Sequence, residues 1–345
     1  MPSDSVADPF LRAQFVNEQT GWAGTSKSLY KTSDTGTTWE RLAFEVPDQS
    51  WISSFFFIDE SKGWLSVTKQ IPTERYGLGN SSQILVTNNG GKTWNLQTNL
   101  MSEARVKVIR FSNENYGLAI GARIIDQPVN HGAPYDEMLI LSTDNGGATW
   151  IDISEPAKTA LKSRSDSGWA IHSQSVNEVF LLTANGRVLH TSDRGKTWNN
   201  IAKFKDERPG GVVSSTAYYK LFLSPEKRIR VIGGAIGDEG YWGDLIVNNK
   251  DGSWISYELV LRPIWDAVFL SEDEVLACGV EMRGAGDERK LPRVGIILHS
   301  LDSGKTWTPL YRSQAKETFI NLTKVGEKKF HAVSDAGTLV KFSLN

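Results

Sequence analysis

The stretch Thr87-Asn88-Asn89-Gly90-Gly91-Lys92-Thr93-Trp94 decides the fold, because its pattern recurs along the chain. An Asp or Asn follows a Thr or Ser by two positions, a Gly comes two positions later, and a Thr-Trp pair ends the motif. Four further copies occupy residues 32–39, 143–150, 191–198 and 300–307, and a shorter copy occupies residues 248–254. The six final tryptophans are spaced by 48 to 56 residues, and such a regular period predicts a repeat architecture.

Each copy of this motif, called the box below, has the chemistry of a hairpin turn. The Asp or Asn oxygen accepts backbone N–H groups within the turn, and the Gly supplies a positive φ at little cost. The Thr begins the outgoing strand, and the Trp is expected to pack against a neighbouring sheet, where its large ring buries much area. The boxes are therefore predicted to be structural turns that do not touch a substrate.

The residues around the boxes complete a four-stranded unit, with strands named A to D in chain order. An apolar strand, a polar turn and a second apolar strand come before each box strand. In the fourth unit the expected strands are 169–175, 178–184, 187–192 and 197–202, with Asn185-Gly186 as the tight turn between B and C. Four antiparallel strands repeated at this period are typical of a β-propeller blade, so the sequence predicts an all-β fold.

The innermost strands are expected to start near residues 10, 51, 105, 168, 218, 265 and 318, which predicts seven blades in a single domain. The expected blades are residues 10–43, 51–98, 105–153, 168–202, 218–259, 265–311 and 318–343. A six-bladed propeller is the alternative if one unit is misread. The last unit ends without a D strand, and residues 2–8 are expected to supply it, because this closure would remove an open sheet edge.

Composition narrows the possible functions. The 345 residues include 38 basic and 40 acidic ones, so nothing in the charge favours nucleic acid as a partner. A single Cys excludes a disulfide framework, and neither metal-ligand spacing among the histidines nor a cofactor fingerprint is present. No metal, cofactor or membrane insertion is therefore expected. Residues 1–9 lack the pattern of an export signal, and the compartment stays open.

The boxes resemble the BNR/Asp-box repeat of sialidases, other glycoside hydrolases and further propellers. The fuller unit, with Gly21-Trp22-Ala23-Gly24 as its second strand, resembles the photosystem II stability/assembly factor family and its bacterial relatives. That resemblance implies a seven-bladed propeller that holds a polypeptide client, in a family whose members are usually exported. A sialidase is disfavoured, because Leu11-Arg12-Ala13 does not match the Arg-Ile-Pro signature typical of that class.

Long insertions between strands B and C mark one face of the predicted propeller. They cover roughly residues 70–82, 124–136, 235–243 and 281–293, and they should project from the face opposite the boxes. Long loops on a rigid scaffold often carry binding groups. The candidate binding residues in or next to these insertions are Arg75, Arg123, Trp242 and Arg283, and the competing interpretation is that each is only a solvated loop residue.

A second set of candidates lies at the start of strand A. Trp51, Trp169 and Trp265 each precede an equivalent turn position, namely Asp59, Asn177 and Asp273, by eight residues, and Arg105 and Tyr218 fill the same place in the third and fifth units. These residues are expected to ring the channel mouth as a platform for sugar rings, aromatic side chains or an extended peptide. Arg105 could also hold a carboxylate. The competing interpretation is a satellite core beneath the loops.

The sequence thus favours a non-enzymatic scaffold that binds a polypeptide on the insertion face, and no catalytic residue is assigned. The alternative is a carbohydrate-active protein, either a glycoside hydrolase or a sugar-binding module. Hydrolysis would need two carboxylates about 5 to 9 Å apart. The candidates on the insertion face are Asp126, Asp136, Glu137, Asp238, Glu239 and Asp244.

Overall fold

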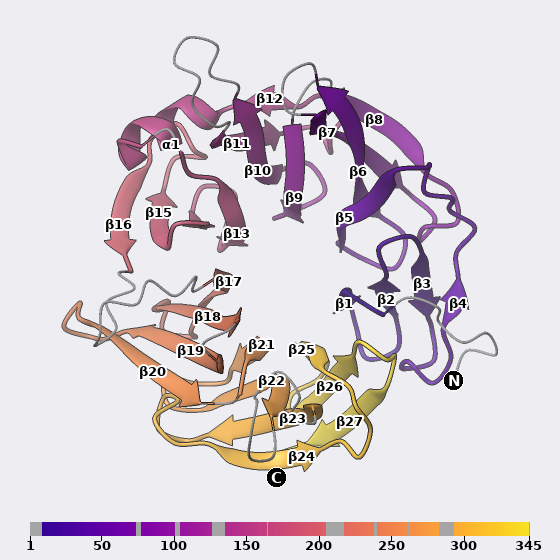
Figure 1. The fold of residues 1–345 in the computed structure, drawn as a ribbon. Helices are drawn as coiled ribbons and strands as arrows, with labels where there is room; N and C mark the ends of the chain where they lie inside the picture. The colour runs from indigo at the N-terminus through magenta and orange to yellow at the C-terminus, as the bar shows by residue number, and fades with distance from the viewer. Residues whose placement is uncertain are drawn as a thin grey trace. The chain divides into compact units, whose positions relative to one another are not determined.

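A computed structural model describes residues 9–73, 77–100, 104–125, 135–163, 165–204, 217–237, 240–260, 262–282 and 293–344 (Figure 1). Nearly all regular structure in this part of the chain is β, with one short helix. The strands form seven antiparallel sheets, each built from strands that are consecutive in the chain. These sheets are the blades of a β-propeller, so the predicted fold class and the number of blades are confirmed.

The first three blades contain β1 (Arg12–Phe15), β2 (Gly21–Gly24), β3 (Leu29–Thr32) and β4 (Glu40–Arg41), then β5 (Ser50–Phe57), β6 (Gly63–Thr73), β7 (Gly77–Thr87) and β8 (Asn95–Leu100), then β9 (Ala104–Phe111), β10 (Gly117–Ile125), β11 (Tyr135–Thr143) and β12 (Ile151–Asp152). Helix α1 (Ser154–Leu161) follows the third blade.

The fourth and fifth blades contain β13 (Gly168–Ser173), β14 (Val179–Thr183), β15 (Arg187–Thr191) and β16 (Asn199–Lys203), then β17 (Ala217–Leu223), β18 (Ile229–Gly237), β19 (Gly240–Asn248) and β20 (Trp254–Val260). The last two contain β21 (Ile264–Phe269), β22 (Val275–Met282), β23 (Arg293–Ser300) and β24 (Thr308–Arg312), then β25 (Phe319–Lys324), β26 (Lys329–Ser334) and β27 (Leu339–Ser343).

The chain divides into two compact units. The first unit comprises Met1–Thr25, Tyr30–Glu40 and Lys205–Asn345, and the second comprises Ser26–Leu29 and Arg41–Phe204. Blades two, three and four and helix α1 belong to the second unit. Each unit has apolar cores of its own, such as the cluster around Ile120 and Leu181 in the second and the one around Leu245 and Ile296 in the first.

The boxes form the turns that the sequence predicts. In the first box the Asp34 carboxylate accepts the Thr38 N–H at 2.9 Å, and the Thr32 hydroxyl accepts the Gly36 N–H at 2.8 Å. Gly36 has a φ of +75° and Thr35 one of 63°, so two successive residues are left-handed. The backbone N–H of Thr38, followed by its hydroxyl, lowers the pKa of Asp34 to about 2. The carboxylate is therefore ionised across the physiological range and stabilises the turn there.

The boxes and the turns between strands A and B lie at the same end of each blade, as the propeller topology predicts. The backbone of each of the five full-length boxes donates a hydrogen bond to that turn, for example from Gly90 to the Ser61 carbonyl at 2.7 Å and from Gly146 to the Asn115 carbonyl at 2.8 Å. We call this end of a blade the box end. The opposite end carries the hairpins between strands B and C and is called the hairpin end.

Aromatic stacking joins adjacent blades within the second unit. Trp64 of β6 is fully buried and lies parallel to the ring of Phe111 in β9, with ring centroids 3.4 Å apart. The Trp64 indole also donates a hydrogen bond to the Gly146 carbonyl in the third box, at 3.0 Å. The box residue Trp150 joins the same core and meets Phe111 edge to face. Phe111 belongs to the same blade as Trp150, whereas Trp64 comes from the preceding blade, so this core spans two blades.

The last blade and most of the first blade belong to the first unit, where β1 lies beside β25 (Figure 1). The Phe10 N–H donates to the Asp335 carbonyl at 2.8 Å, and the buried Phe10 ring packs in a core that includes Val333 and Leu339. The Lys329 ammonium lies 2.9 Å from the Glu18 carboxylate. The predicted closing strand, residues 2–8, lies outside the described residues and stays a prediction.

His331 makes the contact between these two blades sensitive to pH. Its ring is buried and meets Phe15 edge to face at a centroid distance of 4.8 Å. Burial, and secondarily the charge of Lys341, lowers the pKa of His331, whereas Glu18 opposes the shift. Because the unfolded state binds this proton more readily, the stability that His331 contributes is present above about pH 6.5 and is lost as the pH falls.

We therefore expect the melting temperature of the protein to fall between pH 7.5 and pH 5.5, and to fall less steeply in His331→Gln. Thermal unfolding followed by circular dichroism at several pH values measures both slopes. Equal slopes in the two proteins would show that His331 does not carry this dependence.

Two features differ from the sequence-based expectations. The insertion at residues 70–82 is mostly paired strand, because β6 and β7 stay in register out to Thr73 and Gly77. The same holds at residues 235–243, where β18 and β19 pair out to Gly237 and Gly240. Most residues of the insertions at 124–136 and 281–293 lie outside the described residues. Helix α1 was not predicted; it is a single short element of eight residues between the third and fourth blades.

Candidate functional site

A β-bulge recurs in the innermost strands and controls which side chains they present. The register with strand B shifts by one residue in six of the blades. In four of them the residue of strand A that is skipped in this register is Ser53, Lys107, Trp169 or Trp265. Each of these residues lies six positions before the residue that opens the turn between strands A and B. Bulges re-aim side chains and are frequent next to functional sites.

This register corrects the predicted equivalence of the tryptophans. The turn of the second blade opens on Asp59, whose carboxylate accepts the Ser61 N–H at 2.7 Å. In the fourth blade the Ser175 hydroxyl accepts the N–H of Asn177 at 3.2 Å, so the turn opens on Ser175. Asn177 is therefore equivalent to Ser61 rather than to Asp59.

The same correction applies in the sixth blade, where the Ser271 hydroxyl accepts the Asp273 N–H. Trp169 and Trp265 are thus equivalent to Lys107 and Ser53 at the bulge. Trp51 and Arg105 form a separate pair two positions earlier. The expectation that all three tryptophans share one position is wrong by two residues.

Glycines on strand B allow the bulges. A Cβ added at Gly121 would lie 1.9 Å from the Arg105 carbonyl oxygen, and one at Gly279 would lie 2.1 Å from the Pro263 carbonyl oxygen. Only a residue without a side chain lets the backbones approach this closely. The glycine therefore fixes where the bulge places Lys107 in the third blade and Trp265 in the sixth.

In the second unit these bulges bring a charged and aromatic group of residues together at the hairpin end. The Arg105 guanidinium lies 3.2 Å from the Asp136 carboxylate, and the Lys107 ammonium lies 3.7 Å from the same oxygen. The Lys107 ammonium also lies 4.6 Å from the centre of the Trp169 ring and 2.9 Å from the Ser167 hydroxyl. We call Arg105, Lys107, Asp136 and Trp169 the inner cluster.

The inner cluster combines an exposed aromatic ring with two neighbouring cations. Trp169 is 37% exposed, although most other tryptophans of the described chain are buried or half-buried. Burial, and secondarily the charge of Arg105, lowers the pKa of Lys107 to about 8, while Asp136 acts in the opposite direction. Two cations thus share one carboxylate beside an accessible indole, an arrangement suited to a ligand that carries both an anionic and an apolar group.

The other predicted residues fall into three groups. Arg123 binds the Asp152 carboxylate of the outer strand at 2.8 Å, and the half-buried Trp51 lies at the start of β5 opposite Thr68. Half-buried Trp265 belongs to the first unit, as do Tyr218 and Trp242, whose backbones pair with β18. Arg75 and Arg283 lie outside the described residues. Of the nine candidates, the inner cluster contains Arg105 and Trp169.

The sequence analysis missed Lys107. The sequence does contain a sign of its role, because Lys107 places a second charged residue in the otherwise apolar start of strand 104–111, two residues after Arg105. The bulge that turns the ammonium onto Trp169 has no local sequence mark, since the required glycine is on another strand.

The carboxylates expected for hydrolysis are partly accounted for. Asp136 is bound to Arg105, and Glu137 is bound to Lys158 at 2.6 Å. Asp244 lies on β19, and Asp126, Asp238 and Glu239 lie outside the described residues.

Within the part of the chain that the structure describes, no group of three His, Cys, Asp or Glu side chains could hold a metal ion. The same residues include no helix of a length and apolarity that would cross a bilayer.

Comparison with known proteins identifies the fold. No family model and no curated protein matches the sequence. Among solved structures, 98% of the chain matches 94% of YCF48 bound to D1 peptide, with a TM-score of 0.63 and 16% identity. Likewise, 97% of it matches 96% of YCF48 from Cyanidioschyzon merolae, again with a TM-score of 0.63 and 16% identity.

A glycoside hydrolase shares the fold as well. The match to the GH74 xyloglucanase from Xanthomonas campestris covers 97% of this chain and 52% of the xyloglucanase, with a TM-score of 0.61 and 12% identity. At these identities the likeness concerns the fold. The chain therefore has the β-propeller fold of YCF48, a photosystem II assembly factor, as the resemblance of its repeats to that family indicated.

Proposed function

We propose that the protein is a non-enzymatic scaffold that holds an extended polypeptide at the hairpin end of its blades. The inner cluster carries this proposal, since it presents an exposed indole beside two cations that both lie within 4 Å of the Asp136 carboxylate. The fold of YCF48, one of whose structures contains D1 peptide, supports a polypeptide as the ligand class.

The chemistry of the inner cluster suits a short peptide segment. An aromatic or aliphatic side chain of the partner would stack on Trp169, which is accessible and held in place by Lys107. A partner carboxylate would compete with Asp136 for Arg105 and would form charge-assisted hydrogen bonds there. A rigid aromatic with an adjacent Arg is a common centre of binding energy in protein interfaces.

The test is a crosslinking pull-down from the source cells with Trp169→Ala and Arg105→Gln, followed by titration of the captured partner. We expect each change to lower affinity by roughly tenfold or more, as hot-spot truncations do. Lys92→Gln is the matched control, because Lys92 is an exposed residue of a box and lies at the opposite end of its blade. Partner binding that is indifferent to both inner-cluster changes would reject this surface.

A carbohydrate-active protein is the second candidate, and the extent of the structural likeness to the GH74 xyloglucanase favours it. The same variants distinguish it from the scaffold. Binding on a glycan array that is lost in Trp169→Ala would identify a sugar as the ligand. Xyloglucan turnover that is lost in Asp136→Asn would identify a hydrolase.

A further inference from the structure

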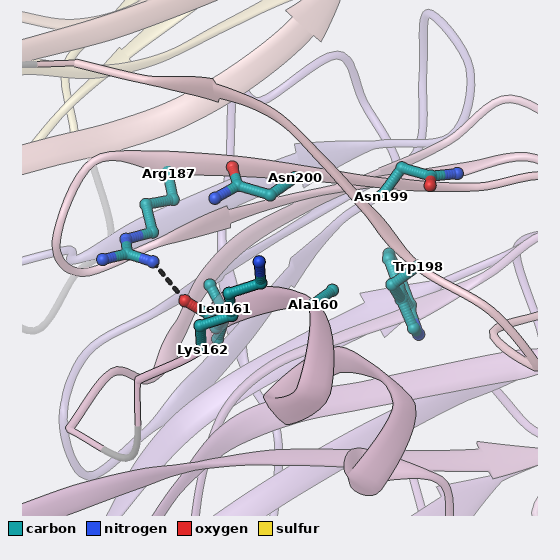
Figure 2. Close-up of a pocket in the computed structure, with 7 residues that line it drawn as sticks. All are labelled: Ala160, Leu161, Lys162, Arg187, Trp198, Asn199 and Asn200. Atoms are coloured by element: carbon teal, nitrogen blue, oxygen red, sulfur yellow. Dashed lines mark hydrogen bonds between the residues drawn. The ribbon is translucent and has the colours of Figure 1, made fainter.

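A cleft of about 590 Å³ lies on the outer part of the fourth blade, within the second unit (Figure 2). It is lined by Ala160, Leu161, Lys162, Arg187, Trp198, Asn199 and Asn200. Its walls are the last turn of helix α1, the first residue of β15 and the beginning of the outermost strand, β16. The volume lies in the range of small-molecule sites, and none of these residues belongs to the inner cluster.

The end of helix α1 is fixed in a way that forms one wall of the cleft. Lys162 has a left-handed φ of 51°, and its N–H closes the helix on the carbonyls of Lys158 and Thr159. The Arg187 guanidinium donates a hydrogen bond to the Leu161 carbonyl, drawn as the dashed line in Figure 2. Because Arg187 comes from β15, this bond ties the helix to the blade and gives the cleft a fixed width.

The cleft is electropositive. Lys162 is exposed, half-buried Arg187 faces it, and Lys203 pairs with Arg187 in the β15–β16 register. No acidic side chain lines the cleft. Asp166 lies 3.9 Å from the Arg187 Nε, but its side chain is fully buried and accepts the N–H groups of Ser167 and Asn185. Asp166 therefore partly compensates the charge of Arg187, but it is not itself accessible from the cleft.

The remaining lining groups give the cleft a polar rim and an apolar floor. Asn199 and Asn200 are exposed on β16, and the Asn200 amide lies on the same side as Arg187 in Figure 2. An amide both donates and accepts hydrogen bonds, which matches the hydroxyl groups of a sugar. The buried Leu161 and the Trp198 ring lie below this rim and next to the helix. Such a floor suits the C–H face of a ring.

We propose that this cleft binds an anionic monosaccharide, a sugar phosphate or a sugar acid. Arg187 and Lys162 bind its anionic group, the Asn200 amide binds a hydroxyl group, and Leu161 and Trp198 support the ring. An isolated inorganic anion would leave most of the cleft unfilled. A neutral apolar molecule would cover Lys162 and the accessible part of Arg187 without supplying a counter-charge.

Calorimetric titration with four probes tests the proposal: glucose 6-phosphate, glucuronate, glucose and inorganic phosphate. We expect one or both of the first two to bind roughly tenfold or more tightly than glucose and phosphate, because charge-assisted hydrogen bonds add to ring contacts. The comparison between glucose 6-phosphate and glucuronate identifies the anionic group. Equal binding of glucose, or binding of phosphate alone, would overturn the proposal.

Lys162→Gln provides the sharper test, because its exposed side chain can change without removing the bond between Arg187 and Leu161. We expect it to weaken binding of the preferred anionic sugar by roughly tenfold. Lys196→Gln, an exposed residue in the box of the same blade, is the matched control and should have no effect. No loss in Lys162→Gln, or an equal loss in both variants, would contradict a defined site.

Discussion

Replacing Gly121 with alanine should lower the free energy of unfolding by about 3 kcal/mol, as overpacking of a backbone contact does. The added methyl would lie 1.9 Å from the Arg105 carbonyl oxygen, 2.9 Å from its carbonyl carbon and 3.0 Å from the Lys107 nitrogen. All three atoms belong to the backbone of β9, so no side chain can move away to relieve the clash. Urea unfolding followed by tryptophan fluorescence measures the change.

Gly326→Ala is the matched control for this substitution. A Cβ at Gly326 would lie nearest to the Cβ and Cδ atoms of Lys329, both at 3.3 Å and neither of them a backbone atom, and the expected change is within about 0.5 kcal/mol. Because the clash displaces the backbone that carries Arg105 and Lys107, Gly121→Ala should also weaken partner binding. A Gly121→Ala protein as stable as the parent would contradict the bulge geometry of the third blade.

Asp266→Ala should be similarly damaging, with a loss of about 3 to 5 kcal/mol. Asp266 is 4% exposed, and its carboxylate lies 2.7 Å from the Lys220 ammonium. It also accepts hydrogen bonds from the Asn321 amide at 3.1 Å and from the Leu322 N–H at 3.0 Å. Its removal leaves these donors without their acceptor and loosens three consecutive blades of the first unit together.

Asp48→Ala is the control for the loss of one carboxylate, because Asp48 is exposed in the connection before β5. Its expected effect is within about 0.5 kcal/mol. Asp266→Asn is informative as well, since it keeps the shape of the side chain and removes only its charge. If Asp266→Ala unfolds at the same urea concentration as Asp48→Ala, the carboxylate does not hold the blades together.

Local chemistry explains why most of the fold could be predicted from the sequence. Every contact that defines a box, such as those between Thr32, Asp34 and Thr38, connects residues at most four positions apart. The pattern therefore survives in each copy and gives the period of the blades. Aligning the blades by residue type failed at the turns between strands A and B. The turn opens on Ser175 in the fourth blade and on Asp59 in the second, and each side chain accepts the N–H of the residue two positions later.

The inner cluster was only partly predictable, because it depends on contacts between distant residues. Arg105 and Asp136 are 31 positions apart, and Lys107 and Ser167 are 60 apart. The strand pairing that brings them together is set by Gly121, which the sequence marks only as one glycine among 31. The extended hairpins at 70–82 and 235–243 were interpreted as loops because their residues are mostly polar or glycine. Their pairing as strands depends on the opposite strand and leaves no apolar alternation in the sequence.

The contact between β1 and β25 also affects the order of events during synthesis on a ribosome. The second unit is almost one continuous segment, Arg41–Phe204, and its sheets can pair as soon as that segment has emerged. The first blade must wait for Phe319–Ser343 before Phe10 and Phe15 find their partners. Until Phe319–Ser343 has been synthesised, β1 lacks its final neighbour, and a chaperone that shields β1 would act before that point.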